Sequence, residues 1–275
     1  MEVEILMKKF IIKLLNKKFI FNKTLGDSLK YQAMTLAEVL ITLGIIGVVA
    51  AITLPTLINN YQNTQYVTSL KKGYTEFNEV LKEMSADAGC VNDLQCSGLF
   101  DTGTTYTTLG DEFVKHIKIV KNCKTNAGQG CWSANTNYYY DGTSTTNYTF
   151  DTDGYYTFIT ADGMSVGVQN YANNCTQGGT GWTTGELGYM SKVCGVVLFD
   201  VNGLKKPNNW GRDVFTFFIT NGKGALLYPQ SGKDDNYNNT NSWWNYNNLN
   251  RCSSSAKNGN YCTGRIIENG WVMDY

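Results

Sequence analysis

The chain has 275 residues, with 23 basic and 23 acidic side chains, 42% hydrophobic residues and eight cysteines. The balanced charge provides no electrostatic footprint for nucleic acid, so no nucleic-acid partner is expected. His116 is the only histidine, and the sequence contains no nucleophile motif. We therefore do not expect an enzyme.

Residues 1–33 predict a cytoplasmic leader. They contain seven lysines and three acidic residues, a net charge of +4, and positively charged flanks of apolar segments stay in the cytoplasm. Within the leader, lysines interrupt the apolar residues of the stretch 10–21. This stretch is either an interfacial helix or an upstream extension that precedes a true start at Met7, and the sequence leaves both open.

Residues 34–57 form an apolar run with one carboxylate, Glu38, near its head. A bilayer span needs about 20 predominantly apolar residues, so the run predicts a transmembrane helix. A charge within such a span costs roughly 3 kcal/mol or more unless it has a partner. Cleavage between Ala33 and Met34 would create an α-amino group one helical turn from Glu38 of the same chain and of a bundled neighbour. We therefore expect this carboxylate to serve assembly.

The segment A-M-T-L-A-E at residues 33–38, followed by the apolar helix, resembles the cleavage and methylation motif of type IV prepilins and of type II secretion pseudopilins. The resemblance implies that a prepilin peptidase cuts before Met34 and N-methylates it, and that Glu38 pairs with the amino terminus of a neighbouring subunit. It also implies three further partners: other pilin or pseudopilin subunits, an inner-membrane assembly platform and membrane lipid. Ala33 stands where glycine is usual in the family, and Met34 stands where phenylalanine is commonest. Pro55 matches a proline that often bends the helix of family members as it leaves the membrane.

Two other interpretations of this segment are weaker. A simple signal anchor leaves Glu38 without a role, although intramembrane carboxylates are rare and usually functional. A cleaved secretory signal peptide carries an apolar core of about 7–15 residues followed by a small-residue cleavage site. Here the apolar run is longer, and the small residue Ala33 precedes it.

Residues 58–89 predict an amphipathic continuation of the same helix. Apolar residues recur at steps of three and four, the spacing of one helical face. The stripe consists of Val67, Leu70, Tyr74, Phe77, Leu81 and Met84. We expect it to pack against a sheet rather than to form a partner-binding seam, because a β-rich region follows. Gly89 is expected to cap the helix.

All eight cysteines follow the apolar segment, which indicates that residues 90–275 fold in an oxidising compartment. Loop closure favours pairing between near neighbours. The expected disulfides are Cys90 with Cys96, Cys123 with Cys131, Cys175 with Cys194, and Cys252 with Cys262. A zinc site is not expected, because no C-x-x-C pair occurs and the chain has a single histidine.

Short strand-like runs in the C-terminal region predict an antiparallel sheet. The predicted strands are 155–160, 164–168, 195–199, 214–220 and 225–228. The turns Asp162-Gly163 and Asn221-Gly222 lie between two pairs of these runs and are strong hairpin signals. Residues 111–120 predict a short helix before the sheet.

The stretch D-V-N-G-L-K-K-P-N at residues 200–208, continuing to G-R-D-V-F at residues 211–215, resembles a segment found in many pilin-like proteins of this type. Its oxygen-bearing side chains are of the kind that calcium takes, and some pseudopilins bind calcium. The candidate ligands are Asp200, Asn202 and Asp213, or Asp151 with Asp153. Ordinary turn chemistry explains the same residues better. No cofactor is therefore expected, with calcium as the alternative.

Residues 236–250 combine tryptophan and tyrosine with many asparagines. Aromatic side chains in such a setting stack on sugars or form subunit contacts, and a variable polar loop explains the stretch equally well. A membrane-tethered surface protein that binds glycans through this loop is therefore the rival function. A tethered protein has no need of Glu38 or of a methylated amino terminus.

Together these features predict an α+β, pilin-like fold: a long N-terminal helix, transmembrane in its first half, packed on a disulfide-braced antiparallel sheet. We expect a single-pass protein of the inner membrane with its C-terminal domain outside the cytoplasm, which enters a filament when assembled. A pseudopilin or minor pilin is favoured over a major pilin, because residues 90–275 are bulky for the main repeating unit.

Overall fold

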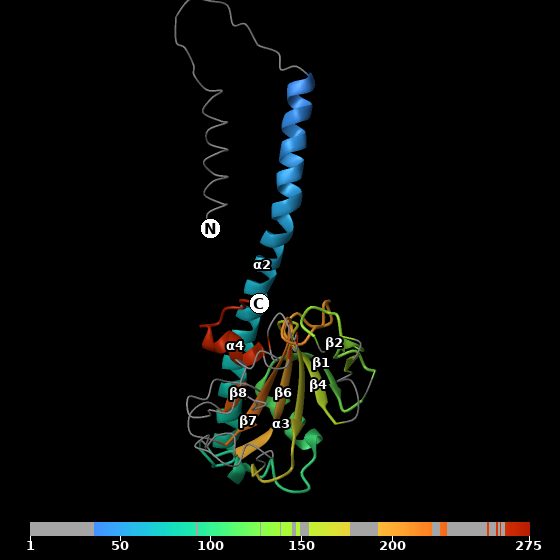
Figure 1. Ribbon diagram of the computed structural model, residues 1–275. Helices are drawn as coiled ribbons and strands as arrows, with labels where there is room; N and C mark the ends of the chain where they lie inside the picture. The colour runs from blue at the N-terminus through green and yellow to red at the C-terminus, as the bar shows by residue number, and fades with distance from the viewer. Residues whose placement is uncertain are drawn as a thin grey trace, which may run out of the picture. The chain divides into compact units, whose positions relative to one another are not determined.

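The computed structural model describes most of the chain from Leu36 to Tyr275 (Figure 1). The described residues are 36–91, 93–126, 128–137, 139–144, 147–148, 154–176, 192–221, 226–229, 252, 257, 259 and 262–275. Two compact units comprise Met1–Leu54 and Pro55–Tyr275, and helix α2 (Leu36–Asp87) runs through both. The expected leader, residues 1–33, lies outside the described residues.

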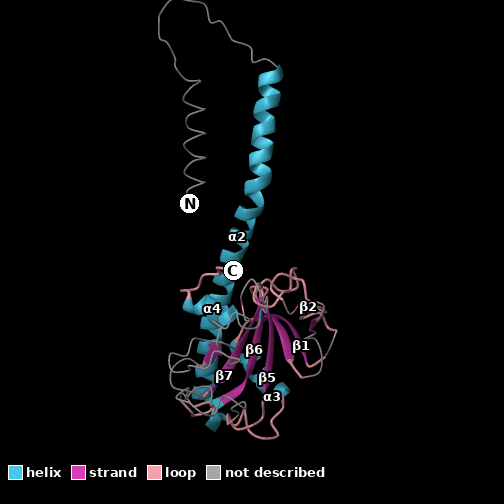
Figure 2. Ribbon diagram, in the orientation of Figure 1, coloured by secondary structure: helices cyan, strands magenta, loops and turns pink. Residues whose placement is uncertain are grey.

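The architecture is α+β, as expected, with a long apolar N-terminal helix followed by an antiparallel sheet (Figure 2). The elements after α2 are η1 (Gln95–Ser97), α3 (Tyr106–His116), β1 (Ile119–Lys124), β2 (Thr136–Asn137), β3 (Asn147–Tyr148), β4 (Tyr156–Thr160), β5 (Ser165–Asn170), β6 (Val193–Asp200), β7 (Val214–Thr220), β8 (Leu227–Pro229) and α4 (Cys262–Glu268). Six strands form one sheet in the order β1-β4-β5-β6-β7-β8, and β2 pairs with β3 separately.

The C-terminus of α2 is closed by the glycine that the sequence predicts as its cap. Gly89 has a φ of +74°, in the left-handed region that glycine adopts without steric strain. Its N–H donates to the Ala86 carbonyl at 2.8 Å, and the Cys90 N–H donates to the Ser85 carbonyl at 2.8 Å. These bonds satisfy two carbonyls that the end of a helix otherwise leaves unpaired. The helix therefore stops where the first disulfide-bonded segment begins.

The second half of α2 buries the predicted apolar stripe. Leu70, Phe77 and Leu81 are at most 1% exposed. The centroid of the Phe77 ring lies 4.8 Å from that of Phe199 on β6 and 5.6 Å from that of Phe113 on α3. The expectation that the stripe covers the sheet is therefore confirmed.

A buried amide on the same helix fixes its position against the edge strand β8. Asn78 Oδ1 accepts hydrogen bonds from the main-chain N–H groups of Leu226 and Leu227, at 2.9 and 3.0 Å. A buried N–H group without a partner costs about 1–3 kcal/mol. The amide therefore favours one register of α2 along the sheet.

The central strands β6 and β7 are buried along their whole length. Side chains alternate between the two faces of a strand, and each face has its own apolar cover. Phe199 and Phe217 belong to the cluster that contains the α2 stripe, whereas Leu198 and Phe218 pack in a second cluster with Trp132. Burial on both faces explains why these strands read as continuous apolar runs.

The predicted strands are confirmed to within a few residues. β4 pairs antiparallel with β5 across the predicted turn at Asp162-Gly163. β6 pairs with β7, and β7 pairs with β8, again antiparallel. Gly222 of the second predicted turn, and residues 223–225 after it, lie outside the described residues.

The helix predicted over residues 111–120 is wrong at both ends. α3 begins at Tyr106, because the Thr105 side chain accepts a hydrogen bond from the Thr108 N–H and caps the helix. It ends at His116, and the following residues form β1, which pairs with β4. Short apolar runs fit a helical or a strand period about equally well. Here residues 119–124 form a strand because they pair with β4 at the edge of the sheet.

Gly110 is expected to be required for the packing of α3 on β4. A Cβ atom at this position would lie 2.0 Å from the Tyr156 ring, which is fully buried. Gly110→Ala should lower the free energy of unfolding by about 2–3 kcal/mol, although alanine is the better helix former. Gly73→Ala is the matched control, because its Cβ would lie 3.0 Å from the flexible end of Met164 and at an ordinary contact distance of 3.9 Å from the Phe199 ring. Chemical denaturation compares the two, and equal stabilities would contradict this packing.

Candidate functional site

The first half of α2 presents a continuous apolar surface. The helix is long and apolar enough to cross a membrane, and every residue of its most apolar 18-residue stretch is at least partly exposed. Its exposed large apolar residues are Leu36, Leu40, Ile41, Leu43, Ile45, Ile46, Val48, Ile52, Leu54, Leu57, Ile58 and Tyr61. A surface of this kind is stable in lipid or against other apolar helices, and not in water.

Glu38 lies exposed in the first turn of this helix. A negative charge is favoured there, because the helix N-terminus carries a partial positive charge. A helix has about 3.6 residues per turn, so residue 34 of a continued helix would lie about one turn before Glu38. Ala33 and Met34, the residues that flank the expected cleavage, lie outside the described residues. Cleavage and methylation therefore stay predictions.

Glu38 is the only charged residue between Leu36 and Leu70. Two of the threonines in the apolar stretch are satisfied within the helix itself. Thr42 Oγ1 donates to the Glu38 carbonyl at 2.9 Å, and Thr53 Oγ1 donates to the Val49 carbonyl at 2.9 Å. The Glu38 carboxylate is thus the one charged group in this apolar part of the chain.

Two glycines and a proline also mark this part of α2. A Cβ atom at Gly44 or Gly47 would meet nothing within 4 Å outside the backbone of its own helix, and small residues let helix backbones approach closely in membranes. Pro55 lies inside the helix and begins the second unit. Proline has no N–H to donate to the Ala51 carbonyl. The bend and the assembly role that the family resemblance implies for Pro55 stay predictions.

All eight cysteines are paired. The disulfides join Cys90 to Cys96, Cys123 to Cys131, Cys175 to Cys194 and Cys252 to Cys262. These are the pairs that near-neighbour loop closure predicts. Disulfides stabilise a fold chiefly by restricting the unfolded chain, so each bridge restrains a short local loop of the C-terminal region.

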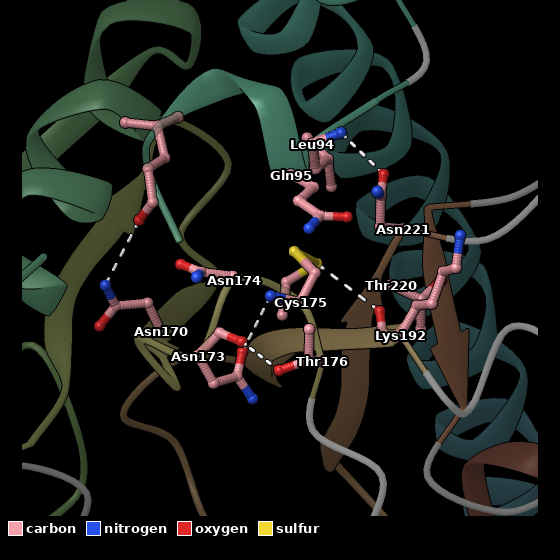
Figure 3. Close-up of a disulfide and its surroundings, with 12 residues drawn as sticks. Leu94, Gln95, Asn170, Asn173, Asn174, Cys175, Thr176, Lys192, Thr220 and Asn221 are labelled. Atoms are coloured by element: carbon pink, nitrogen blue, oxygen red, sulfur yellow. Dashed lines mark hydrogen bonds between the residues drawn. A yellow bond between two sulfur atoms is a disulfide. The ribbon is translucent and has the colours of Figure 1, made fainter. Parts of the chain in front are cut away.

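Figure 3 shows the disulfide that ties the segment after β5 to β6, together with the asparagine side chains around it. Asn221 Oδ1 accepts a hydrogen bond from the Leu94 N–H at 2.8 Å. Asn170 Nδ2 donates to the Thr104 carbonyl at 2.9 Å. The amides attach the connection between α2 and α3 to the sheet, which is a structural role.

The candidate calcium ligands Asp200, Asn202 and Asp213 gather where β6 leads into β7. Asp213 is fully buried and accepts hydrogen bonds from the main-chain N–H groups of Asn208 and Asn209, at 2.8 and 2.6 Å. Asn202 Nδ2 donates to the same carboxylate at 3.1 Å. Within residues 200–215, Asn202, Asn208 and Asn209 are therefore joined to Asp213 in one hydrogen-bonded cluster.

Other candidates from the sequence lie apart from this cluster or outside the described residues. Asp151, Asp153 and the aromatic stretch 236–250 are among the residues not described. His116 ends α3, with its Nε2 3.5 Å from a carboxylate oxygen of Glu112. Within the described part of the chain, no three His, Cys, Asp or Glu side chains are grouped so that they could hold a metal ion.

The C-terminal segment makes contacts that sequence reasoning missed. Arg265 donates to both oxygens of the Asp274 carboxylate, at 2.7 and 2.9 Å, and the Tyr275 hydroxyl donates to a carbonyl of the β6–β7 connection. The centroid of the Trp271 ring lies 5.4 Å from that of Tyr74 on α2. The signal in the sequence is the aromatic ending W-V-M-D-Y, since apolar aromatic side chains favour burial.

With the geometry established, the chain can be compared with known proteins. No protein-family model, curated protein or solved structure matches it. We therefore infer function from its own residues, above all from Glu38, the apolar surface of α2 and the disulfide-braced domain.

Peptide mapping without reduction should recover all four disulfides, because the eight cysteines are paired in the fold. Protein taken from its native membrane and alkylated without prior reduction should carry no label on cysteine. A reduced and alkylated sample supplies the positive control. Labelling of several cysteines in the unreduced sample would contradict folding in an oxidising compartment.

Proposed function

We propose that this chain is a prepilin-like subunit of a type II secretion pseudopilus or of a type IV pilus. A prepilin peptidase cuts it before Met34 and methylates the new amino group, and the subunit assembles through the first half of α2. The observation that carries the proposal is Glu38, a single carboxylate in the first turn of an exposed apolar helix. It stands where the family motif has its glutamate.

The energetics of this carboxylate favour assembly over simple anchoring. A lone subunit can hold Glu38 near the polar headgroups at the membrane surface. In a bundle of helices the side chain loses water, and a buried charge without a partner costs several kcal/mol, roughly 3–5. The α-amino group of a neighbour's Met34 supplies the opposite charge, because its ordinary pKa of about 8 keeps it protonated at neutral pH.

The remaining features support the cellular setting of the proposal. The length and apolarity of α2 support a single-pass protein of the inner membrane, and four disulfides support a periplasmic or surface location for the C-terminal domain. The partners are the prepilin peptidase, other pilin or pseudopilin subunits, the inner-membrane assembly platform and membrane lipid. The bulk of residues 90–275 favours a pseudopilin or minor pilin.

Mature protein from native membranes should begin at Met34 and carry an N-methyl group. Mass spectrometry of the terminal peptide measures both, and a strain without prepilin peptidase activity supplies the unprocessed control. An intact leader in the mature protein would contradict the proposed pilin-like function. It would favour the rival function, a membrane-tethered protein that binds glycans.

Glu38→Gln separates assembly from anchoring. The substitution keeps the side-chain size and eases insertion, so a mere anchor should tolerate it. We expect the variant to reach the membrane, to be cleaved and to form its disulfides, yet to enter filaments at less than one-tenth of the wild-type level, as expected for the loss of about 1.4 kcal/mol or more. The measurement is the amount of the chain in sheared filaments or in the secretion complex, in a strain that lacks the native copy.

Glu79→Gln is the matched control for this experiment. Glu79 is exposed on the same helix and pairs with Lys82 at 2.8 Å, and surface pairs of this kind contribute about 0–1 kcal/mol. The control should assemble normally. If Glu38→Gln assembles as well as Glu79→Gln, the assembly role of Glu38 is wrong.

A further inference from the structure

An arginine without a counter-ion lines a small pocket beside α2. Arg212 lies in the connection between β6 and β7, and its side chain makes no ion pair with any carboxylate among the described residues. Its Nε atom is buried and has no hydrogen-bond partner in the part of the chain that the structure describes. A guanidinium stays charged at physiological pH and carries five N–H donors in a planar fork. Arg212 is therefore available to bind an anion.

The rest of this pocket supplies further hydrogen-bond donors. Its polar lining includes Asn59 and Asn63 of α2 and Tyr140. Side-chain amides and hydroxyls can each donate to an anion. Burial, and then the charge of Asp141, raise the pKa of Tyr140, which keeps its hydroxyl protonated. The pocket encloses about 160 Å³, less than the roughly 300–1,000 Å³ of sites for drug-sized ligands. The space therefore suits one small charged group, such as a phosphate.

Among the described residues, Asp141 is the one carboxylate that lines the pocket, and it has partners of its own. Asp141 Oδ2 lies 2.7 Å from Lys257 Nζ. Asp141 Oδ1 accepts hydrogen bonds from the N–H and the hydroxyl of Thr143, at 3.0 and 2.8 Å. Because Lys257 neutralises Asp141, the positive charge of Arg212 is left uncompensated. The pocket therefore favours a ligand with one negative charge.

The pocket lies just beyond the end of the predicted membrane span. That span ends at Leu57, and α2 continues through Asn59 and Asn63 within the same compact unit. At 1.5 Å per residue, the two asparagines lie about 3 and 9 Å beyond Leu57 along the helix axis. The headgroup layer on each side of a bilayer is about 5–7 Å thick. When α2 crosses a membrane, the pocket therefore lies at the level of the lipid phosphates.

A second pocket, with an apolar wall, adjoins the first. It encloses about 320 Å³, shares Asn63 and Met273 with the first pocket, and is also lined by Trp271 and Val272. Figure 1 shows this C-terminal end of the chain beside α2. Val272 is exposed, as is Tyr61 on the helix, and tryptophan and tyrosine are enriched where proteins meet the membrane surface. An apolar groove beside a cationic pocket matches a phospholipid, whose phosphate adjoins its acyl chains.

We propose that Arg212, with Asn59 and Asn63, binds the phosphate of an anionic phospholipid in the membrane that α2 crosses. The guanidinium donates N–H groups to the phosphate oxygens, and the acyl chains follow the apolar residues of the helix. A lipid with one net negative charge balances Arg212, so the pocket prefers it to a lipid with a zwitterionic headgroup. The bound lipid holds the C-terminal domain against the membrane surface. This inference rests on the membrane location of α2 and not on filament assembly.

The test uses the full chain in detergent, with phosphatidylglycerol or phosphatidylcholine added, and native mass spectrometry measures the lipid that each chain retains. The wild type should bind phosphatidylglycerol more tightly than phosphatidylcholine. Arg212→Gln should bind phosphatidylglycerol about fivefold more weakly than the wild type, or weaker still. Lys205→Gln is the matched control, because it removes an exposed cation of the same connection that does not line the pocket. Glu38→Gln should bind lipid as the wild type does, so this proposal and the assembly proposal fail separately.

A measurement on the wild type keeps the proposal falsifiable if Arg212→Gln fails to fold. In phosphatidylglycerol bilayers, solid-state NMR should detect dipolar coupling between lipid phosphorus and the carbon-13-labelled guanidinium of an arginine. The conservative variant Arg212→Lys should remove this signal and so assign it.

Four results would overturn the proposal. They are equal phosphatidylglycerol binding by the wild type and Arg212→Gln, coupling of lipid phosphorus to other arginines alone, full displacement of the lipid by an equal concentration of inorganic phosphate, and a dimer that Arg212→Gln abolishes. The third result would assign the pocket to a free anion, and the fourth would assign it to a carboxylate of a second copy of this chain.

Discussion

The packing of α2 against the sheet is the interaction on which the rest of this domain depends. Phe77 alone contacts rings from three elements, Phe113, Phe158 and Phe199, and full burial of one such side chain stabilises a fold by about 1.5–3 kcal/mol. Because one face of the second half of α2 is committed to the sheet, the helix cannot shift without breaking this core. The glycine cap and the Asn78 bonds then fix where the helix ends and how it lies along β8. The same helix extends toward the N-terminus as an apolar surface, so folding and the proposed assembly share one element.

Sequence patterns predicted the features that depend on local chemistry. The cap at Gly89, the turn at Asp162-Gly163 and the apolar runs of β6 and β7 each reflect a residue type that suits one backbone conformation or one environment. The pairs of cysteines followed from loop closure alone. The boundaries of α3 were wrong, because the cap at Thr105 was overlooked and because the run after His116 fits a strand equally well.

The sequence groups Asp200 with Asp213, but the burial of both carboxyl groups could not be predicted, since turn residues in a sequence do not show which side chains will be buried. Their compensation depends on hydrogen bonds that only the folded connection provides. The cluster and Glu38 pose the same electrostatic problem with different proposed solutions. The Asp213 carboxylate accepts hydrogen bonds from main-chain N–H groups of its own loop, and Glu38 is proposed to find its counter-charge on another subunit. A low dielectric raises the free-energy cost of a charge without a partner, so each carboxylate is stable only with a partner in the right place.

The most direct test of the assembly claim is a zero-length crosslink between an amine and a carboxylate, formed with a carbodiimide in filaments assembled from equal amounts of light and isotope-heavy subunits. If the account is correct, mass spectrometry will find the N-terminal Met34 amine of one subunit joined to Glu38 of another, as mixed light–heavy pairs. The Glu38→Gln variant, added as a trace subunit, should yield no such product from its own position 38. Filaments in which Glu38 crosslinks to no amino terminus, or only to that of its own chain, would contradict the central claim.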